Sequence, residues 1–352
     1  MQSPSSVQEL VEAVRATPRV IAVGAGTKAR LAQVGREFTR ISTVGLRGII
    51  DYEPSEFTFT ALAGTPVKEI MAALAERGQY LPFDPMLGDA GATLGGTVAA
   101  GLSGPGRVRF GSLRDFILGV RFVDGEGRLL RLGGRVVKNA AGFDIPKFFV
   151  GSAGRFCALA EITFKVFPKP LTLRTLRLEA KDAETKARIF SEAARARWEL
   201  DALDAALEEQ AVYARIGGPA EALDPLVAEI LGRYRGEAMT PGEGSYIWQS
   251  VVGCRWAHSG GTLAKVALTP LDVPDFAATL RAQAGVRGWI SAGGNVGYVS
   301  VAAGEALPKL KWPGMTLRGE GPLWLGPRRS FEIERAVKAA LDPQGRFPGL
   351  ED

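Results

Sequence analysis

Glycine residues dominate the stretch from Gly88 to Gly111, which holds eight of them. They alternate with apolar residues such as Leu94 and Val98, whereas flexible glycine-rich linkers carry few apolar anchors. Glycine in an ordered apolar run indicates a backbone with a positive φ or a close approach to another group. One such group is a phosphate, because successive backbone N–H groups can form a concave anion site without a lysine. Taken by itself, the stretch fits a phosphate-bearing ligand and a ligand-free core turn equally well.

A second glycine-rich loop, Gly24 to Lys28, follows a short apolar segment at residues 19–23. The spacing Gly24-x-Gly26-x-x-Ala29 satisfies the loose dinucleotide-binding fingerprint. In a Rossmann unit a helix begins at this loop, and an acidic residue ends the second strand about 20 positions further on. Here the following segment is interrupted by Gly35 and ends in β-branched residues, and no acidic residue stands at that place. The sequence therefore argues against a Rossmann unit.

Short elements must position these two loops. A capping box from Ser6 to Glu9 predicts a helix that ends before Pro18. Thr65 and Pro66 are the expected N-cap and first residue of a second helix, which Gly78 closes. Strands are expected at residues 19–23, 48–52, 56–63, 117–123, 128–132 and 159–166, and a further helix at 145–150.

The composition fits an ordinary globular protein of one large or, more in keeping with 352 residues, two domains. The net charge of +5 comes from scattered basic residues, which argues against a nucleic-acid partner. The first residues do not read as a signal peptide, and the uncharged run 90–106, which no other exceeds in length, is too short for a transmembrane segment. We expect a cytoplasmic location, with membrane association through partner subunits left open.

Cysteine and histidine counts restrict the redox and metal chemistry. Cys157 and Cys254 are the only cysteines, whereas an iron–sulfur cluster needs about four thiolates. His258 is the only histidine, so no histidine cluster can bind a metal and no second histidine can act as a base. We therefore expect no metal site in this chain.

Six motifs in a fixed order carry a resemblance to a known family. They are GAGTK (24–28), GTPVKEIMAALAERGQYLPFDP (64–85), GATLGGTVAAGLSGP (91–105), FGSLRDFILGV (110–120), GGRVVKNAAGFDIPKFFVGSAG (133–154) and LAEITFKVFPKP (159–170). This order resembles the PCMH-type FAD-binding domain of the vanillyl-alcohol oxidase and p-cresol methylhydroxylase superfamily. It resembles more closely the FAD-binding E subunits of bacterial glycolate oxidases. The similarity covers about residues 20–170.

The resemblance implies an α+β fold with a PCMH-type, two-subdomain FAD-binding domain at residues 1–170. A smaller α+β cap-like domain, with an antiparallel sheet and helices on one face, would follow at 171–330. A C-terminal helix and tail, 331–352, would return toward the FAD-binding domain.

The resemblance also implies which residues hold FAD. The loop 24–28 would wrap the diphosphate with main-chain N–H groups, and 91–98 would run beside the cofactor. The implied cofactor-binding residues are Val23, Gly24, Ala25, Gly26, Thr27, Lys28, Pro85, Gly91, Ala92, Thr93, Gly95, Gly96, Thr97, Ser103, Gly104, Ala158, Glu161 and Ile162. Lys138 and Asn139 are equally consistent with a structural and a ligand-binding role. Because no histidine or cysteine stands where this superfamily attaches flavin, we expect noncovalent FAD.

The second half alternates between strand and helix patterns. Strands are expected at 171–180, 211–216, 246–252, 263–268, near Trp289 and at 296–301, with helices at 185–197, 219–235 and 273–284. This order favours an antiparallel sheet with helices on one face. Trp248, Trp256, His258 and Trp289 are candidates for a substrate pocket, although such residues are more often core anchors.

The resemblance implies an FAD-binding subunit of a glycolate oxidase (glycolate dehydrogenase) complex, which oxidises glycolate to glyoxylate. Its partners would be a second FAD-containing glycolate oxidase subunit and an iron–sulfur subunit, and its substrate a small 2-hydroxy acid. No general base is evident, so the catalytic residues stay unassigned. Two alternatives remain: a self-sufficient FAD-dependent dehydrogenase of another 2-hydroxy acid, and a non-catalytic flavin-binding scaffold subunit.

Overall fold

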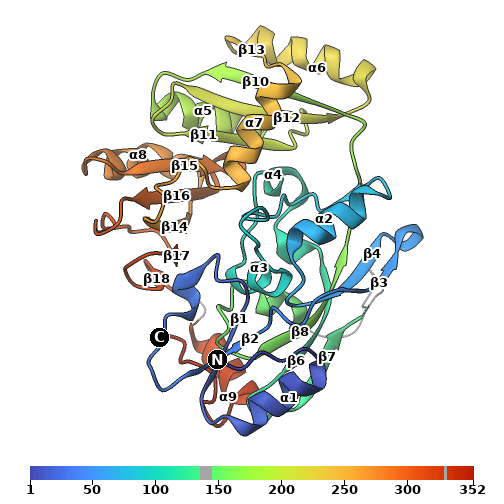
Figure 1. Cartoon of the computed structure of the whole chain (residues 1–352). Helices are drawn as coiled ribbons and strands as arrows, with labels where there is room; N and C mark the ends of the chain where they lie inside the picture. The colour runs from blue at the N-terminus through green and yellow to red at the C-terminus, as the bar shows by residue number, and fades with distance from the viewer. Residues whose placement is uncertain (135–144, 329–330) are drawn as a thin grey trace. The chain divides into compact units, whose positions relative to one another are not determined.

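The computed structural model describes residues 1–134, 145–328 and 331–352. These residues form two compact units (Figure 1). Unit 1 comprises Met1–Leu102, Ser112–Pro168 and Arg328–Asp352, and unit 2 comprises Ser103–Gly111 and Lys169–Pro327. The sequence-based division keeps 103–111 with the first domain, whereas here the segment is part of unit 2. Tyr298 of that unit donates a hydrogen bond from its hydroxyl to the carbonyl of Ser103 over 3.1 Å.

Unit 1 contains a five-stranded sheet in the order β3-β4-β8-β6-β7, with antiparallel neighbours throughout. Its strands are β3 (Ile49–Glu53), β4 (Thr58–Leu62), β6 (Ile117–Val123), β7 (Leu129–Gly133) and β8 (Ala158–Lys165). Two short pairs accompany it: β1 (Val20–Val23) with β2 (Thr39–Ser42), which is parallel, and β5 (Gln79–Tyr80) with β9 (Phe167–Pro168), which is antiparallel. The strands expected in the first half of the sequence are confirmed.

Side-chain hydroxyls cap two helices of unit 1, whereas a third begins at a proline. α1 (Val7–Ala16) follows Ser6, whose hydroxyl accepts a hydrogen bond from the N–H of Glu9, as predicted. α2 (Val67–Ala75) has Pro66 rather than Thr65 at its N-cap, because the Thr65 hydroxyl donates instead to the carbonyl of Leu62. The other helical elements are α3 (Leu94–Ala100), α9 (Phe331–Leu341), η1 (Ala29–Ala32), η2 (Pro54–Glu56), η3 (Leu113–Asp115) and η4 (Ile145–Phe149). α3 therefore occupies the centre of the glycine-rich stretch.

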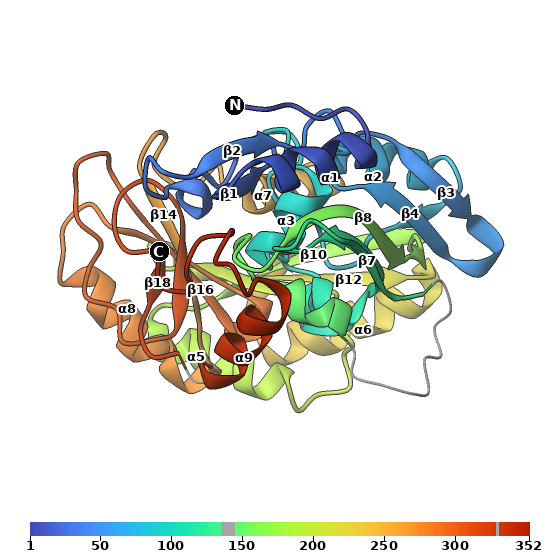
Figure 2. The same cartoon turned by 90° about the horizontal axis from the view of Figure 1, so that it is seen from below.

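A buried apolar cluster fixes the position of β1. Val20 of β1 and Ile41 of β2 pack together with Leu10 of α1 and with Phe347, and Figure 2 shows α1 alongside this strand pair. The N–H of Val20 also donates to the carbonyl of Arg346 over 2.8 Å. Because both ends of the described chain contribute to this core, they jointly hold the strand that leads into the loop 24–28.

Unit 2 is built on a nine-stranded sheet in the order β13-β10-β12-β11-β15-β16-β14-β17-β18. Its strands are β10 (Thr172–Glu179), β11 (Ala202–Ala206), β12 (Ala211–Gly218), β13 (Gly236–Ala238), β14 (Thr262–Ala267), β15 (Arg287–Ser291), β16 (Val296–Val301), β17 (Gly314–Arg318) and β18 (Trp324–Leu325). All neighbouring strands are antiparallel. The helical elements are α4 (Arg107–Phe110), α5 (Ala183–Ala193), α6 (Ala220–Arg233), α7 (Pro241–Val252), η5 (Pro270–Asp272), α8 (Val273–Arg281) and η6 (Ala292–Gly294).

The helix α7 corrects the strand predicted at 246–252. Thr240 and Glu243 form a capping box, with Pro241 at the first helical position, and these start signals outweigh the β-prone residues that follow. α5, α6 and α8 contribute to the same apolar cluster as Leu176 of β10. Trp248 of α7 instead donates a hydrogen bond to Thr175, the neighbouring residue, over 2.9 Å. Because adjacent strand residues point to opposite faces, α7 lies on the other face of the sheet, and the prediction that all helices cover one face was wrong.

The described residues contain neither a membrane-spanning helix nor a cluster of metal-ligating side chains. Within ranges 1–134, 145–328 and 331–352, no helix combines the length and apolarity that crossing a bilayer requires. The same ranges bring together no group of three or more histidine, cysteine or acidic side chains fit to hold a metal ion.

Candidate cofactor-binding site

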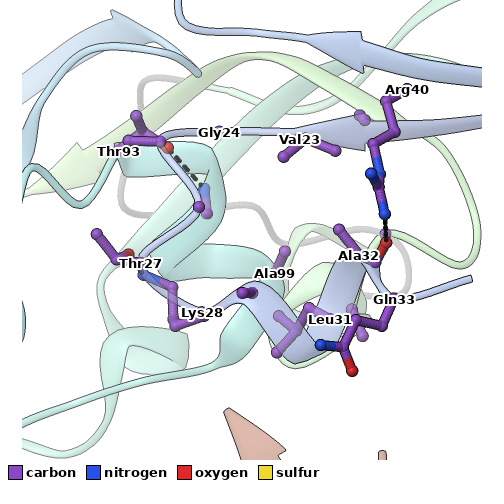
Figure 3. A pocket seen from close by; sticks show the side chains of 17 residues that line it. Val23, Gly24, Thr27, Lys28, Leu31, Ala32, Gln33, Arg40, Thr93 and Ala99 are labelled. Carbon is purple, nitrogen blue, oxygen red and sulfur yellow. Dashed lines mark hydrogen bonds between the residues drawn. The ribbon is translucent and has the colours of Figure 1, made fainter. Parts of the chain in front are cut away.

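A cavity of about 340 Å³ opens in unit 1 at the end of β1 (Figure 3). The loop 24–28 forms one side of it, and η1, β2, α3 and the turn before β8 supply the others. Its lining residues are Ala22, Val23, Gly24, Ala25, Gly26, Thr27, Lys28, Ala29, Leu31, Ala32, Gln33, Arg40, Thr93, Gly96, Ala99, Ala153 and Gly154. This volume lies within the usual range of small-molecule sites. The two glycine-rich stretches singled out in the sequence thus meet at one pocket.

The two glycines of the loop are required for different reasons. A Cβ at Gly24 would collide with the hydroxyl of Thr93, so any larger residue would displace the side chain that caps α3. Gly26 has a φ of +74°, which side-chain-bearing residues rarely adopt, and a Cβ there would meet nothing within 4 Å. The main chain at Gly26 is therefore open toward the cavity rather than covered by neighbouring protein.

The side of α3 that faces the cavity consists of small residues. Thr93, Gly96 and Ala99 recur every three positions and line the pocket together. The Thr93 hydroxyl caps the helix by accepting a hydrogen bond from the N–H of Gly96 over 3.3 Å. Because no side chain here is larger than that of threonine, a ligand can approach the backbone of this helix closely.

The charges in the pocket suit an anionic ligand. Lys28 is buried, and its ammonium donates a hydrogen bond to the Thr27 hydroxyl over 2.9 Å. Arg40 reaches from β2 to the carbonyl of Ala32, to which it donates over 3.3 Å (Figure 3). Among the described residues that line the cavity, none carries a carboxylate. A diphosphate would therefore meet two cations, open main chain and no like charge.

A smaller cavity of about 40 Å³ adjoins the first and shares Ala22, Gly24, Gly96, Ala99 and Gly154 with it. It extends to Gly95, to Leu159 of β8 and to Cys157. Burial raises the pKa of the Cys157 thiol well above its ordinary value, so this thiol stays protonated and unreactive.

The structure brings nine of the eighteen implied residues to these two cavities. They are Val23, Gly24, Ala25, Gly26, Thr27, Lys28, Thr93, Gly95 and Gly96. Seven others in unit 1, Pro85, Gly91, Ala92, Thr97, Ala158, Glu161 and Ile162, do not line either cavity. Glu161 forms an ion pair with Arg121 at 2.5 Å, and the Thr97 hydroxyl is buried without a hydrogen-bond partner. Ser103 and Gly104 belong to unit 2.

Several lining residues were not expected from the sequence. Arg40 reaches the pocket because β1 and β2 pair in parallel, with Arg40 opposite Ile21. Ala99 could have been found from its three-residue spacing to Gly96, whereas Leu31, Gln33 and Ala153 carry no such signal. Lys138 and Asn139 lie outside the described residues.

The aromatic candidates of unit 2 make structural contacts. Trp289 is buried, and its indole N–H donates to the Asp204 carboxylate over 2.9 Å. His258 Nε2 lies 2.8 Å from the carbonyl of Gly285.

Burial raises the pKa of Asp204 to about 7, although hydrogen bonds from Trp289 and from the N–H of Ala292 oppose this shift.

Comparison with known proteins identifies the cofactor. Residues 1–133 match the family model described as "FAD binding domain". The chain therefore contains an FAD-binding domain. Over 157 residues it is 45% identical to the glycolate oxidase subunit GlcE of Escherichia coli, covering 45% of this chain and 43% of that protein. Over 144 residues it is 29% identical to the glycolate oxidase subunit GlcD of Bacillus subtilis, covering 41% of this chain and 30% of that protein. The aligned part thus spans less than half of each of these relatives.

Solved structures support the fold alone. An alkyldihydroxyacetonephosphate synthase superimposes with a TM-score of 0.71 over 98% of this chain and 74% of its own, at 15% identity. The α+β class and the PCMH-type FAD-binding fold predicted from the sequence are confirmed.

Proposed function

We infer that this chain is the FAD-binding subunit of a glycolate oxidase (glycolate dehydrogenase) complex, in which glycolate is oxidised to glyoxylate. The observation that carries the proposal is the pocket of unit 1, whose glycine loop and two cations suit the diphosphate of FAD. The 45% identity to a glycolate oxidase subunit over 157 residues supports glycolate as the substrate of the complex.

In this proposal the main chain of Gly24 to Lys28 holds the diphosphate, and the Lys28 ammonium neutralises part of its charge. α3 would contact the cofactor through the small residues Thr93, Gly96 and Ala99. Cys157 beside the smaller cavity is held in its thiol form by burial, which favours a noncovalently bound FAD. When bound, FAD supplies the oxidising power, because it accepts two electrons from a 2-hydroxy acid.

The electrons must leave the flavin through other proteins. With two cysteines in the sequence, this chain cannot hold an iron–sulfur cluster. We therefore propose an iron–sulfur subunit and a second FAD-containing subunit as partners, and a cytoplasmic complex that is attached to a membrane through those partners. No residue of this chain is assigned as the base that takes the hydroxyl proton, which favours the second flavin subunit as the place of substrate chemistry.

A second candidate is a self-sufficient dehydrogenase of another 2-hydroxy acid. It is favoured by 28% identity over 207 residues to a D-2-hydroxyglutarate dehydrogenase of Xanthomonas citri, which covers 57% of this chain and 43% of that enzyme. A third is a non-catalytic flavin-binding scaffold subunit; if its flavin site is degenerate, the protein would purify colourless and resist reconstitution with FAD.

Absorption spectroscopy of the purified chain separates these possibilities. We expect a noncovalent flavin spectrum that is released by denaturation, and no bleaching by glycolate until the partner subunits are added. Rapid bleaching of the isolated chain by glycolate, D-lactate or D-2-hydroxyglutarate would instead support the self-sufficient dehydrogenase. Protein that stays colourless after incubation with FAD would contradict both enzyme proposals.

A further inference from the structure

Arg155 is the largest side chain in the described residues of unit 1 that has no exposed surface. It does not line the cofactor pocket but lies behind it. One guanidinium nitrogen, Nη1, donates hydrogen bonds to two carbonyls, that of Leu31 over 2.8 Å and that of Ala153 over 2.6 Å. The other, Nη2, donates to the carbonyl of Asp352 over 2.7 Å.

The two carbonyls held by Nη1 belong to different walls of the pocket. Leu31 lies on η1, which directly follows the loop 24–28, and Ala153 lies in the turn before β8. The N–H of Ala153 donates to the carbonyl of Ala99 on α3 over 2.8 Å, so this turn is also fixed to the third wall. A single nitrogen atom thus joins η1 to the turn and, through the turn, to α3.

The turn needs such support because its backbone conformation is uncommon. Ala153 has a φ of +50° and is followed by Gly154 at +73°. A non-glycine residue in this region is strained and is held there by its surroundings. The carbonyl of Ala153 is held by Arg155, and the carbonyl of Arg155 itself accepts a hydrogen bond from Lys338 over 2.6 Å.

Burial lowers the pKa of Arg155 to about 10, and the side chain is still a cation at neutral pH. A buried cation is tolerated only where acceptors surround it, and removing it leaves its acceptors buried without donors. Neighbouring charges act on it in both directions, because Asp352 favours the cation and Arg30 and Arg328 oppose it.

We propose that Arg155 is a positioning residue for FAD, which sets the separation of the pocket walls formed by η1 and by the turn 151–154. This inference rests on the proposed function, since it takes the pocket to be the FAD site. It predicts that Arg155 contributes to FAD affinity without touching the cofactor, by keeping the empty pocket at the width that the bound state requires.

The test compares the FAD dissociation constants of four proteins, measured at 15 °C by quenching of flavin fluorescence. They are the parent chain, Arg155→Met, Arg155→Lys and the control Arg36→Met, which removes the same charge from an exposed position after η1. We expect the constant to rise about tenfold or more in Arg155→Met, since the buried carbonyls of Leu31 and Ala153 both lose this donor. Arg155→Lys keeps a cation and some of the donors, so its dissociation constant should lie between those of the parent and Arg155→Met. The dissociation constant of Arg36→Met should equal that of the parent.

The unfolding temperature of each FAD-free protein provides the readout that separates positioning from mere stability. A structural role alone would lower this temperature in Arg155→Met and leave the dissociation constant unchanged, which would overturn the inference. If Arg155→Met does not fold, Arg155→Lys decides, because parent-like affinity in that variant would also overturn it. If the parent chain binds no FAD, the proposed function itself is overturned. If all four proteins bind FAD equally, only the role of Arg155 is overturned.

Discussion

The hydroxyl of Thr93 occupies the space that a Cβ at position 24 would need. Two stretches separated by more than sixty positions in the sequence therefore fit together only if residue 24 has no side chain. The contact links the loop after β1 to the N-cap of α3, and both line the cofactor pocket.

Gly24→Ala should abolish most of the stabilisation that FAD gives. At 100 times its dissociation constant, a ligand raises the free energy of unfolding by about 2.7 kcal/mol. In Gly24→Ala we expect FAD at the same concentration to raise it by less than about 1 kcal/mol, because the added methyl group distorts the pocket wall. Thermal denaturation with and without FAD measures the difference. Gly88→Ala is the matched control, because its Cβ would meet nothing within 4 Å and its φ is ordinary. An equal FAD shift in Gly24→Ala would contradict the position of the site.

Lys28→Met should weaken FAD binding and make it less sensitive to salt. Its buried ammonium lines the pocket, and a charge-assisted hydrogen bond to phosphate is worth about 1.5–3 kcal/mol, or roughly ten- to a hundredfold in affinity. Titrations with FAD at low and high ionic strength measure both effects. If the dissociation constant of the variant depends on salt as steeply as that of the parent, Lys28 does not face the diphosphate.

Unit 2 should become less stable as the pH rises from about 4 to about 7. Burial raises the pKa of Asp204 from 3.8 to about 7 in the folded protein, so the folded state binds the proton more tightly than the unfolded state. Stability is then greatest below the unfolded pKa and falls as the pH approaches the folded one, by an amount on the order of a few kcal/mol. Urea unfolding monitored by tryptophan fluorescence measures it, since all six tryptophans lie in unit 2.

Asp204→Asn provides the comparison for that experiment. The amide keeps one acceptor oxygen for Trp289 or Ala292 and cannot ionise, so the slope of stability against pH between 4 and 7 should become shallower. A slope unchanged from the parent would assign the pH dependence to other groups.

Lys338→Met should destabilise unit 1 by about 2 kcal/mol or more. The half-buried ammonium of Lys338 forms an ion pair with the buried Asp342 at 2.6 Å and also donates to the carbonyls of Phe347 and Pro348. Removing it leaves a buried carboxylate without its cation. The exposed pair Lys311–Asp275 at 2.8 Å is the contrast, since Lys311→Met should cost about 1 kcal/mol or less. Urea denaturation measures the free energy of unfolding of both variants, and equal losses in Lys338→Met and Lys311→Met would contradict this prediction.

The glycine loop was predictable because its signals are local. Gly24 and Gly26 follow an apolar strand, and the small residues of 93–99 recur at helical spacing. Arg40 could not be found in this way, since strand pairing brings it to the pocket. The hydrogen bond from Arg155 to Leu31 was equally beyond local signals, because it joins residues 124 positions apart. The sequence also misread 246–252 as a strand, because the β-prone residues there obscure the helix start at Thr240.

The division of the chain was also beyond local signals. Pro168 and Pro170 indicate one boundary, and the structure divides the chain between Pro168 and Lys169. The assignment of 103–111 to unit 2 depends instead on contacts such as the ion pair between Arg109 and Asp201 at 2.5 Å. No residue pattern within 103–111 predicts that these residues contact unit 2.

The backbone bond between Val20 and Arg346 has a consequence for the order of events during synthesis. β1, which leads into the loop 24–28, is translated more than three hundred codons before its hydrogen-bond partner Arg346. The core around Phe347 cannot close before then. A nascent chain therefore cannot complete the packing of β1 until the segment around Phe347 has been made, so flavin loading follows the synthesis of that segment.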